Sequence, residues 1–202
     1  MHQTNGTTLL TTVAGRADIA TGIRIAAVLF MTALTATAAQ VSIPLPFTPV
    51  PLTLQPMIVL LGGAALGSRL GMASQVLYLL AGLAGLPVFA TSPALPQGVL
   101  RVLGPTGGYL MAYPLAAFVT GWLAERGFDR RYVTSVVAMV AGLTIIFTCG
   151  ILWLAWFAVP VPAGVQRALQ LGLYPFVGAD LIKVLIASAV LPGVWKLVGR
   201  HT

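Results

Sequence analysis

The feature that most constrains the fold of this chain is the distance between its charged residues. Arg24 and Arg69 are separated by 44 consecutive uncharged residues, and 58% of the 202 residues are hydrophobic while only 7% are charged. Soluble domains carry roughly 25% charged residues, so a water-facing surface of this composition would expose far too much apolar area. The sequence therefore predicts an integral membrane protein whose apolar excess faces lipid.

Uncharged gaps and prolines divide the chain into helices. The gap between Arg24 and Arg69 is twice the ~20 residues that one crossing needs, and the four prolines between positions 44 and 51 cannot continue a helix. We therefore expect two helices joined by a proline-rich loop, 43–51. The same reasoning predicts an all-α bundle of six membrane-spanning helices forming a single domain, 1–202. The spans are expected near 20–41, 51–68, 70–90, 105–125, 132–158 and 166–195.

The Lys and Arg residues set the expected orientation. Six spans put both termini on one side of the membrane, and a cytoplasmic placement of both termini puts eight of the 11 Lys and Arg residues inside. Only Arg101 and Arg167 then lie outside, with Lys183 inside a span, so the positive-inside rule favours N-in and C-in. The densest charge run, 125–131, is short and half neutralised by its own acids. It predicts a loop, and nucleic acid is not an expected partner.

The sequence contains few residues that could catalyse a reaction or bind a metal. The two histidines, His2 and His201, lie at the chain ends, and Cys149 is the single cysteine. A membrane-embedded active site needs a nucleophile, a base or a metal set, so we expect no enzyme, no metal and no cofactor. The phosphate-binding pattern G-x-x-x-x-G-K-[ST] is also absent, so any ATP use must come from another subunit.

Asp180 and Lys183 are the most informative residues of the chain. They fall near the centre of the last predicted span, where an isolated charge costs at least ~2.5 to 3.5 kcal/mol. At a spacing of three they share one helical face, so they can form a structural ion pair or both face a polar ligand. Ionisable residues inside a membrane are functional by default, which favours a ligand with hydrogen-bond donors and acceptors.

A stripe of small and polar residues follows the third predicted helix. Ser68, Gly71, Gln75, Tyr78 and Gly82 recur at intervals of three and four, so this stripe must face protein. The amide of Gln75 is equally suited to a ligand and to a hydrogen bond between two helices that the glycines let pack closely.

Three further candidates lie at the predicted outer ends of the helices. Gln55 follows the proline-rich loop, and Arg101 and Tyr109 flank the glycine-rich turn 104–108. A turn of this kind at a helix N-terminus suggests an anion site. Arg101 could receive a carboxylate there, and an exposed interfacial arginine is an equally good account of it.

Three segments taken together resemble one family. They are 39–55 with its proline-rich loop, the turn 104–109 and the segment 178–183. In this order they look like the BioY family, the biotin-specific substrate-binding (S) components of energy-coupling factor (ECF) transporters. The resemblance covers nearly the whole chain from the first predicted helix to the last.

The resemblance implies biotin uptake across the plasma membrane of a prokaryote. The implied partners are an energising membrane subunit, the T component, and two ATP-binding cassette ATPases. The resemblance also implies that Asp180 and Lys183 line the biotin pocket. On this hypothesis Asp180 accepts ureido N–H bonds, Lys183 and Arg101 supply positive partners, and the loop 43–51 closes as a lid.

The sequence is also compatible with two other functions. The same bundle could serve a different vitamin, which competition by thiamine or riboflavin would test. Asp180 could instead carry a proton in a proton-coupled porter, for which uptake would depend on the proton gradient and not on ATP.

Overall fold

The computed structural model describes residues 17–91, 97–158 and 162–198, with side chains within 21–196 of these ranges. This part of the chain is helical apart from one short hairpin, in which Ser42 pairs with Thr53 and Ile43 with Leu52. In chain order the elements are α2 (Ala17–Gln40), β1 (Ser42–Ile43), β2 (Leu52–Thr53), α3 (Gln55–Leu66), α4 (Ser68–Leu83), α5 (Val99–Leu103), α6 (Gly107–Ala124), α7 (Tyr132–Trp156), α8 (Val165–Gly172) and α9 (Tyr174–Val198).

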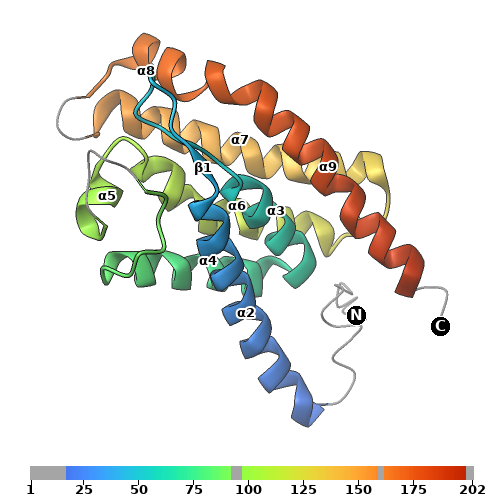
Figure 1. Ribbon diagram of the computed structural model, residues 1–202. Coiled ribbons are helices and arrows are strands. Elements are labelled where there is room, and N and C mark those ends of the chain that lie inside the picture. The colour runs from blue at the N-terminus through green and yellow to red at the C-terminus, as the bar shows by residue number, and fades with distance from the viewer. Residues whose placement is uncertain (1–16, 92–96, 159–161, 199–202) are drawn as a thin grey trace, which may run out of the picture.

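α6 is the central helix of the bundle. It packs against α3, α4 and α7, while α2 crosses α3 and α4, and α9 lies along α7 and α3 (Figure 1). Small residues allow this density: a Cβ added at Gly63 would overlap the carbonyl oxygen of Ala117, and one at Gly121 would overlap the backbone at Gly67 and Ser68. Close backbone approach at small residues is how membrane helices associate without a hydrophobic driving force.

Three helices of the described part are long and apolar enough to cross a membrane. They are Thr21–Gln40, Tyr132–Trp156 and Tyr174–Lys196. α3 has only 12 residues, about 18 Å at 1.5 Å per residue, which is less than the ~30 Å of a bilayer core. The predicted helices 20–41, 51–68, 70–90, 105–125 and 132–158 have their counterparts in α2, α3, α4, α6 and α7.

The last predicted helix, 166–195, is divided in two, which is a correction to the sequence-based expectation. α8 ends at Gly172 and α9 begins at Tyr174. Two local causes are present: Gly172 lies against the Tyr109 hydroxyl, where a Cβ would not fit, and Pro175 suits the first turn of a new helix but not a helix interior.

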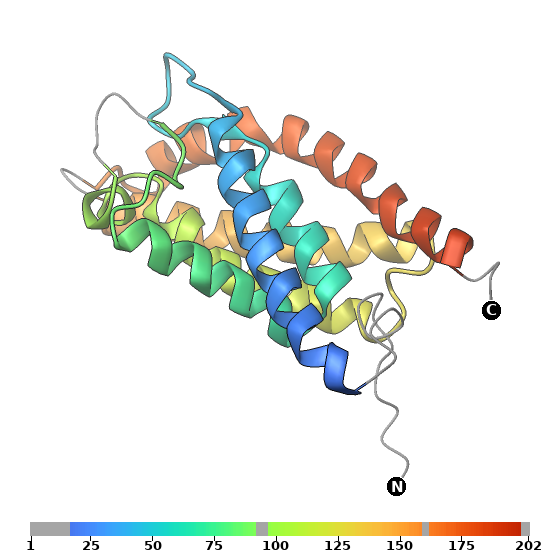
Figure 2. The ribbon, with the colours of Figure 1, turned by 60° about the horizontal axis from the view of Figure 1, so that its bottom comes forward.

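This division also moves the two charges of the last span. Asp180 and Lys183 lie in the second and third turns of α9 instead of near the middle of a span. α8 itself is amphipathic, with Gln166, Arg167 and Gln170 exposed and Ala168 buried, so it lies along the surface of the bundle. The start of α9, which carries the pair, lies close to the end of the bundle with the hairpin and α8 (Figure 2).

The loop between α6 and α7, residues 125–131, turns its two acids inward. Glu125 accepts hydrogen bonds from the backbone N–H and the hydroxyl of Ser68, at 2.7 and 2.9 Å. Asp129 is 1% exposed and accepts a 2.6 Å hydrogen bond from the indole of Trp195. Each acid of the loop therefore also bonds a neighbouring helix, α4 in the case of Glu125 and α9 in the case of Asp129.

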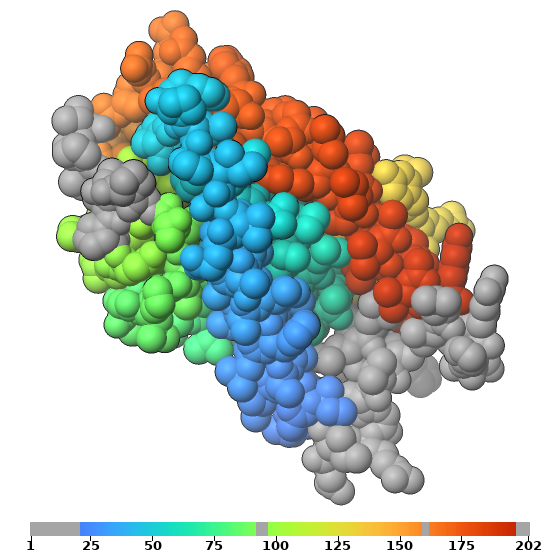
Figure 3. All heavy atoms as spheres, in the orientation of Figure 1, coloured from blue at the N-terminus to red at the C-terminus, as the bar shows by residue number. Residues whose placement is uncertain are grey.

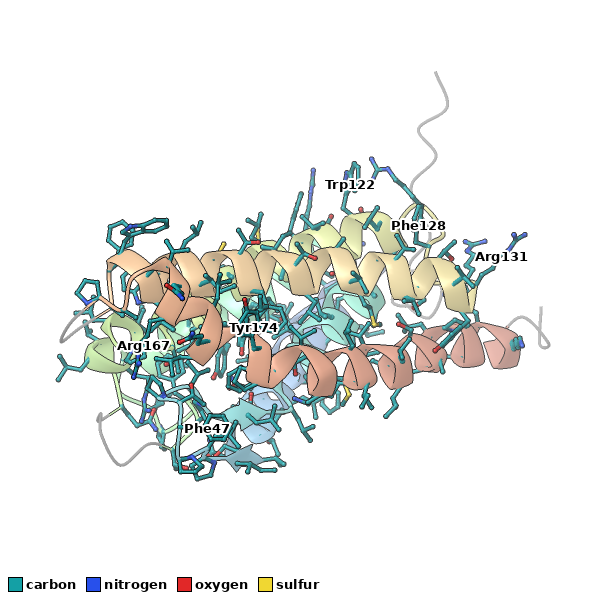
Figure 4. All side chains as sticks on the ribbon, turned by 90° about the horizontal axis from the view of Figure 1, so that it is seen from above. Phe47, Trp122, Phe128, Arg131, Arg167 and Tyr174 are labelled. Carbon is teal, nitrogen blue, oxygen red and sulfur yellow. The ribbon has the colours of Figure 1, made fainter. Side chains whose placement is uncertain are left out.

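The two ends of the bundle differ in what they present. In Figure 4, Phe47 and Arg167 lie toward one end and Phe128 and Arg131 toward the other. The arginine-rich loop 125–131 thus lies opposite the hairpin, as an orientation with both termini in the cytoplasm requires.

Candidate functional site

A cavity lies at the hairpin end of the bundle, and β2 forms part of its wall. The cavity has about 610 Å³ of empty space, which includes the open solvent at its mouth. Its aromatic walls are Phe89, Phe147 and Phe176, and its polar lining residues are Thr53, Gln55, Arg101, Thr106, Tyr109, Tyr113 and Asp180.

The proline-rich loop is fastened over this end of the bundle at two points. The Thr48 hydroxyl donates a 2.6 Å hydrogen bond to the carbonyl oxygen of Leu171 in the last turn of α8. Val50, farther along the loop, and Leu52, in β2, line the cavity. Figure 3 shows the loop, in light blue, packed against α8 and the start of α9. Four prolines limit the number of conformations that the loop must lose to hold this position.

Lys183 provides the second fastening, through the backbone of β2. Its ammonium group donates to Asp180 Oδ1 at 2.7 Å and to the backbone carbonyl of Thr53, in β2, at 2.6 Å. The two side chains are only 14% and 8% exposed, so each charge offsets the desolvation of the other. Asp180 lines the cavity and Lys183 does not. The lysine therefore holds the carboxylate in place and ties α9 to the hairpin.

Gln55 lies at the start of α3, directly after the hairpin. Its side chain is 3% exposed and its Nε2 lies 2.6 Å from the hydroxyl of Tyr78 on α4. That hydroxyl also lies 3.1 Å from the carbonyl oxygen of Val88. The amide is thus held in a buried chain of hydrogen bonds while it lines the cavity.

Arg101 brings a positive charge to the cavity from the short helix α5. It is 4% exposed, and burial lowers its pKa from the ordinary value, although a guanidinium stays protonated at any physiological pH. A buried guanidinium is well suited to bind a carboxylate through two parallel hydrogen bonds. The exposed interfacial arginine considered from the sequence is not what the structure shows.

The glycine-rich turn serves packing within the protein. A Cβ at Gly107 would overlap the carbonyl oxygen of Val102, and one at Gly108 would overlap Trp153. The indole of Trp153 donates to the carbonyl oxygen of Gly104 at 2.9 Å. The close approach that the glycines allow is therefore to the protein's own groups, and Thr106 is the residue of the turn that lines the cavity.

Tyr109 contributes its ring to the cavity wall and its hydroxyl to the fold. The hydroxyl donates a 2.8 Å hydrogen bond to the carbonyl oxygen of Gly172, where α8 ends. The ring packs edge-on against Phe147, with the centroids 6.5 Å apart. Tyr109 therefore joins α6 to the end of α8.

Gln75, like Lys183, does not line the cavity, and the two residues that its amide bonds, Thr35 and Ser74, do not line it either. It is fully buried between α2 and α4, where its Nε2 lies 3.2 Å from the Thr35 hydroxyl and 3.1 Å from that of Ser74. These contacts favour the alternative of an amide bonding between helices. The stripe of which it is part, from Ser68 to Gly82, is buried as predicted.

The structure thus brings Asp180, Arg101, Gln55 and Tyr109 together, with Lys183 behind Asp180. The carbonyl of Thr53 was not predicted, because every residue has a backbone carbonyl and the residue type does not show which one binds a side chain. Sequence reasoning also missed the phenylalanines of the walls, which cannot be told from core residues before the packing is known. In the described ranges no three His, Cys, Asp or Glu residues gather as metal ligands.

Comparisons with known proteins identify relatives of this chain. The family model described as the BioY family matches residues 10–200. A probable biotin transporter BioY of Pyrococcus horikoshii is 42% identical over 79% of this chain and 86% of its own. The biotin transporter BioY of Thermotoga maritima is 39% identical over 82% of this chain and 92% of its own.

A solved structure is similar over most of its length. It is the crystal structure of the S-component for biotin from an ECF-type ABC transporter, with a TM-score of 0.78 and 25% identity, covering 90% of this chain and 95% of that one. The cavity described above therefore lies in a shared fold, and this chain belongs to the BioY family.

Proposed function

We propose that this chain takes up biotin as the substrate-binding S component of an ECF transporter. The observation that carries the proposal is the cavity, whose lining combines aromatic walls with hydrogen-bond acceptors and a buried cation. The chain that contains it belongs to the BioY family. The named relatives are biotin transporters, and the similar solved structure is an S-component for biotin.

Biotin matches the chemistry of this cavity. Its ureido ring carries two N–H donors, and Asp180 and Gln55 bring acceptors to the lining. Its bicycle and valeryl chain are apolar, which suits walls of phenylalanine and tyrosine. Its terminal carboxylate is the natural partner of the buried guanidinium of Arg101. Lys183 acts through Asp180, by holding its carboxylate ionised and oriented.

The proline-rich loop 43–51 acts as the lid of the site. Because Lys183 Nζ bonds both Asp180 and the Thr53 carbonyl, the position of the hairpin is linked to that of the ligand-binding carboxylate. A ligand that binds Asp180 therefore favours the closed position of the loop, at a small entropic cost because the prolines restrict it.

The protein works as part of a larger assembly in the plasma membrane of a prokaryote. The chain forms one membrane domain, 1–202, with six membrane helices, α2, α3, α4, α6, α7 and α9, and with both termini in the cytoplasm. The short α3 is completed on its outer side by the hairpin and the proline-rich loop that precede it. Because its sequence has no phosphate-binding loop, the T component and two ATP-binding cassette ATPases supply the use of ATP. Biotin is its transported ligand, and it needs no cofactor of its own.

Calorimetric titration of the purified protein in detergent tests the proposal. We expect one biotin per chain, no competition from thiamine or riboflavin, and much weaker binding of biotin amide, in which the carboxylate is masked. Arg101→Gln should bind biotin more weakly than the wild type and should discriminate less between biotin and its amide. A folded wild-type sample that gives no heat with biotin would refute the proposal.

A further inference from the structure

The hydrogen bonds around Tyr78 fix which end of the Gln55 amide faces the cavity. The hydroxyl of Tyr78 donates to the carbonyl oxygen of Val88 over 3.1 Å, and a carbonyl oxygen can only accept. The Tyr78 oxygen accepts from the Gln55 Nε2, 2.6 Å away. Gln55 therefore presents its NH₂ group to the tyrosine.

The reversed amide is the less favourable arrangement. Its oxygen and the Val88 carbonyl would both need the single hydroxyl hydrogen of Tyr78, so one of these acceptors would be left without a hydrogen bond. The arrangement with the NH₂ group toward Tyr78 therefore makes one more hydrogen bond than the reverse.

We propose that Tyr78 is a positioning residue that selects for a ureido N–H of the ligand by holding the Gln55 carbonyl oxygen toward the cavity. This rests on the proposed function, since biotin supplies the N–H. Tyr78 itself is fully buried and is absent from the cavity lining, so it acts through Gln55. Its ring is fixed by an edge-on contact with Phe89, at 5.5 Å between centroids.

A purely structural role for the same hydroxyl makes a different prediction. The bond to Val88 joins α4 to the segment that follows it, and its loss would loosen the fold and weaken all ligands alike. A positioning role instead changes the ratio between two ligands that differ at one N–H. The test therefore compares ratios of Kd and not single affinities.

The experiment uses Tyr78→Phe, which keeps the ring and removes the hydroxyl, in the full-length protein. The ligands are biotin and its two cyclic carbamate analogues, in each of which one ureido N–H is replaced by an oxygen of similar size. In the wild type, the analogue with its oxygen facing Gln55 should bind at least roughly tenfold more weakly than biotin, because two acceptors meet. In Tyr78→Phe the amide is free to turn and offer its NH₂ group, so this penalty should shrink by roughly tenfold.

Tyr132→Phe is the matched control. It removes a hydroxyl that donates to a backbone carbonyl, that of Leu185 at 3.3 Å, at the opposite end of the bundle. It should leave all three Kd values unchanged. If Tyr78→Phe weakens biotin and both analogues by one common factor, or changes no ratio, the positioning role is refuted while biotin binding stands. If the wild type binds no biotin, the proposed function fails, and this inference fails with it.

Discussion

Replacing Lys183 with methionine should destabilise the protein because it leaves the Asp180 carboxylate buried without its cation. The ammonium makes a 2.7 Å ion pair with Asp180 and a 2.6 Å bond to the Thr53 carbonyl, and the paired side chains are 14% and 8% exposed. Removing one partner of a buried pair costs about 3–5 kcal/mol, and slight exposure places this pair near 3 kcal/mol. For a protein of this length that lowers Tm by roughly 6–12 °C.

A double-mutant cycle separates the ion pair from ordinary packing. Asp180→Asn alone leaves the ammonium without a counter-charge, and the double variant Asp180→Asn/Lys183→Met leaves no charge at all. We therefore expect the double variant to be more stable than Lys183→Met, with a coupling of about 2 kcal/mol. Thermal unfolding of the four proteins in one detergent measures this. A double variant whose loss equals the sum of the two single losses would refute the reasoning.

Three further outcomes can be measured by the same unfolding assay. Gly63→Ala should lower the free energy of unfolding by about 2 kcal/mol or more, because the added Cβ would overlap a backbone oxygen of α6. Gly193→Ala, with nothing within 4 Å of the added Cβ, should be neutral, and equal losses would contradict the packing account. Tyr109→Phe should lower the free energy of unfolding by about 1 kcal/mol, because it loses the hydrogen bond to Gly172. Its biotin affinity, measured by calorimetry, should be nearly unchanged. Burial raises the pKa of Asp129, opposed by the Trp195 hydrogen bond and the Arg130 charge. The folded state thus binds the proton more tightly, and stability should fall as pH rises from the ordinary carboxyl pKa through the raised one. Asp129→Asn should lose this part of the pH dependence, and an unchanged Tm profile would contradict it.

The outline of the bundle follows from the sequence because charges and prolines are scarce and strongly constrained in a membrane. The proline run 44–51 marks a loop, and the long uncharged gaps mark helices. The break at Leu173 could not be seen in this way, since no charge interrupts 174–179 and a single proline is common in membrane helices. Pro175, three residues after Gly172, was the available signal in the sequence. The second cause, the contact of Gly172 with Tyr109, is seen only in the structure.

The site was predictable where a residue type is costly in a membrane. Asp180 is a charge inside a predicted span and so needed a reason, and it lines the cavity. Arg101 was a candidate only through its place beside the glycine-rich turn, and its burial became visible in the structure. Gln75 and Gln55 are the same residue type on neighbouring helices, and the sequence does not tell which amide meets the cavity and which meets another helix. That depends on how α3 and α4 are rotated about their axes, which packing decides.

The central claim is that Asp180 binds biotin in the cavity beneath the proline-rich loop. Side-by-side calorimetric titrations of wild-type protein and Asp180→Asn with biotin test it most directly, with a thermal unfolding curve to show that both samples are folded. The account predicts one-to-one binding by the wild type and binding weaker by roughly a hundredfold in the variant, as expected when a charged acceptor is lost. Equal affinities in two folded proteins would contradict it.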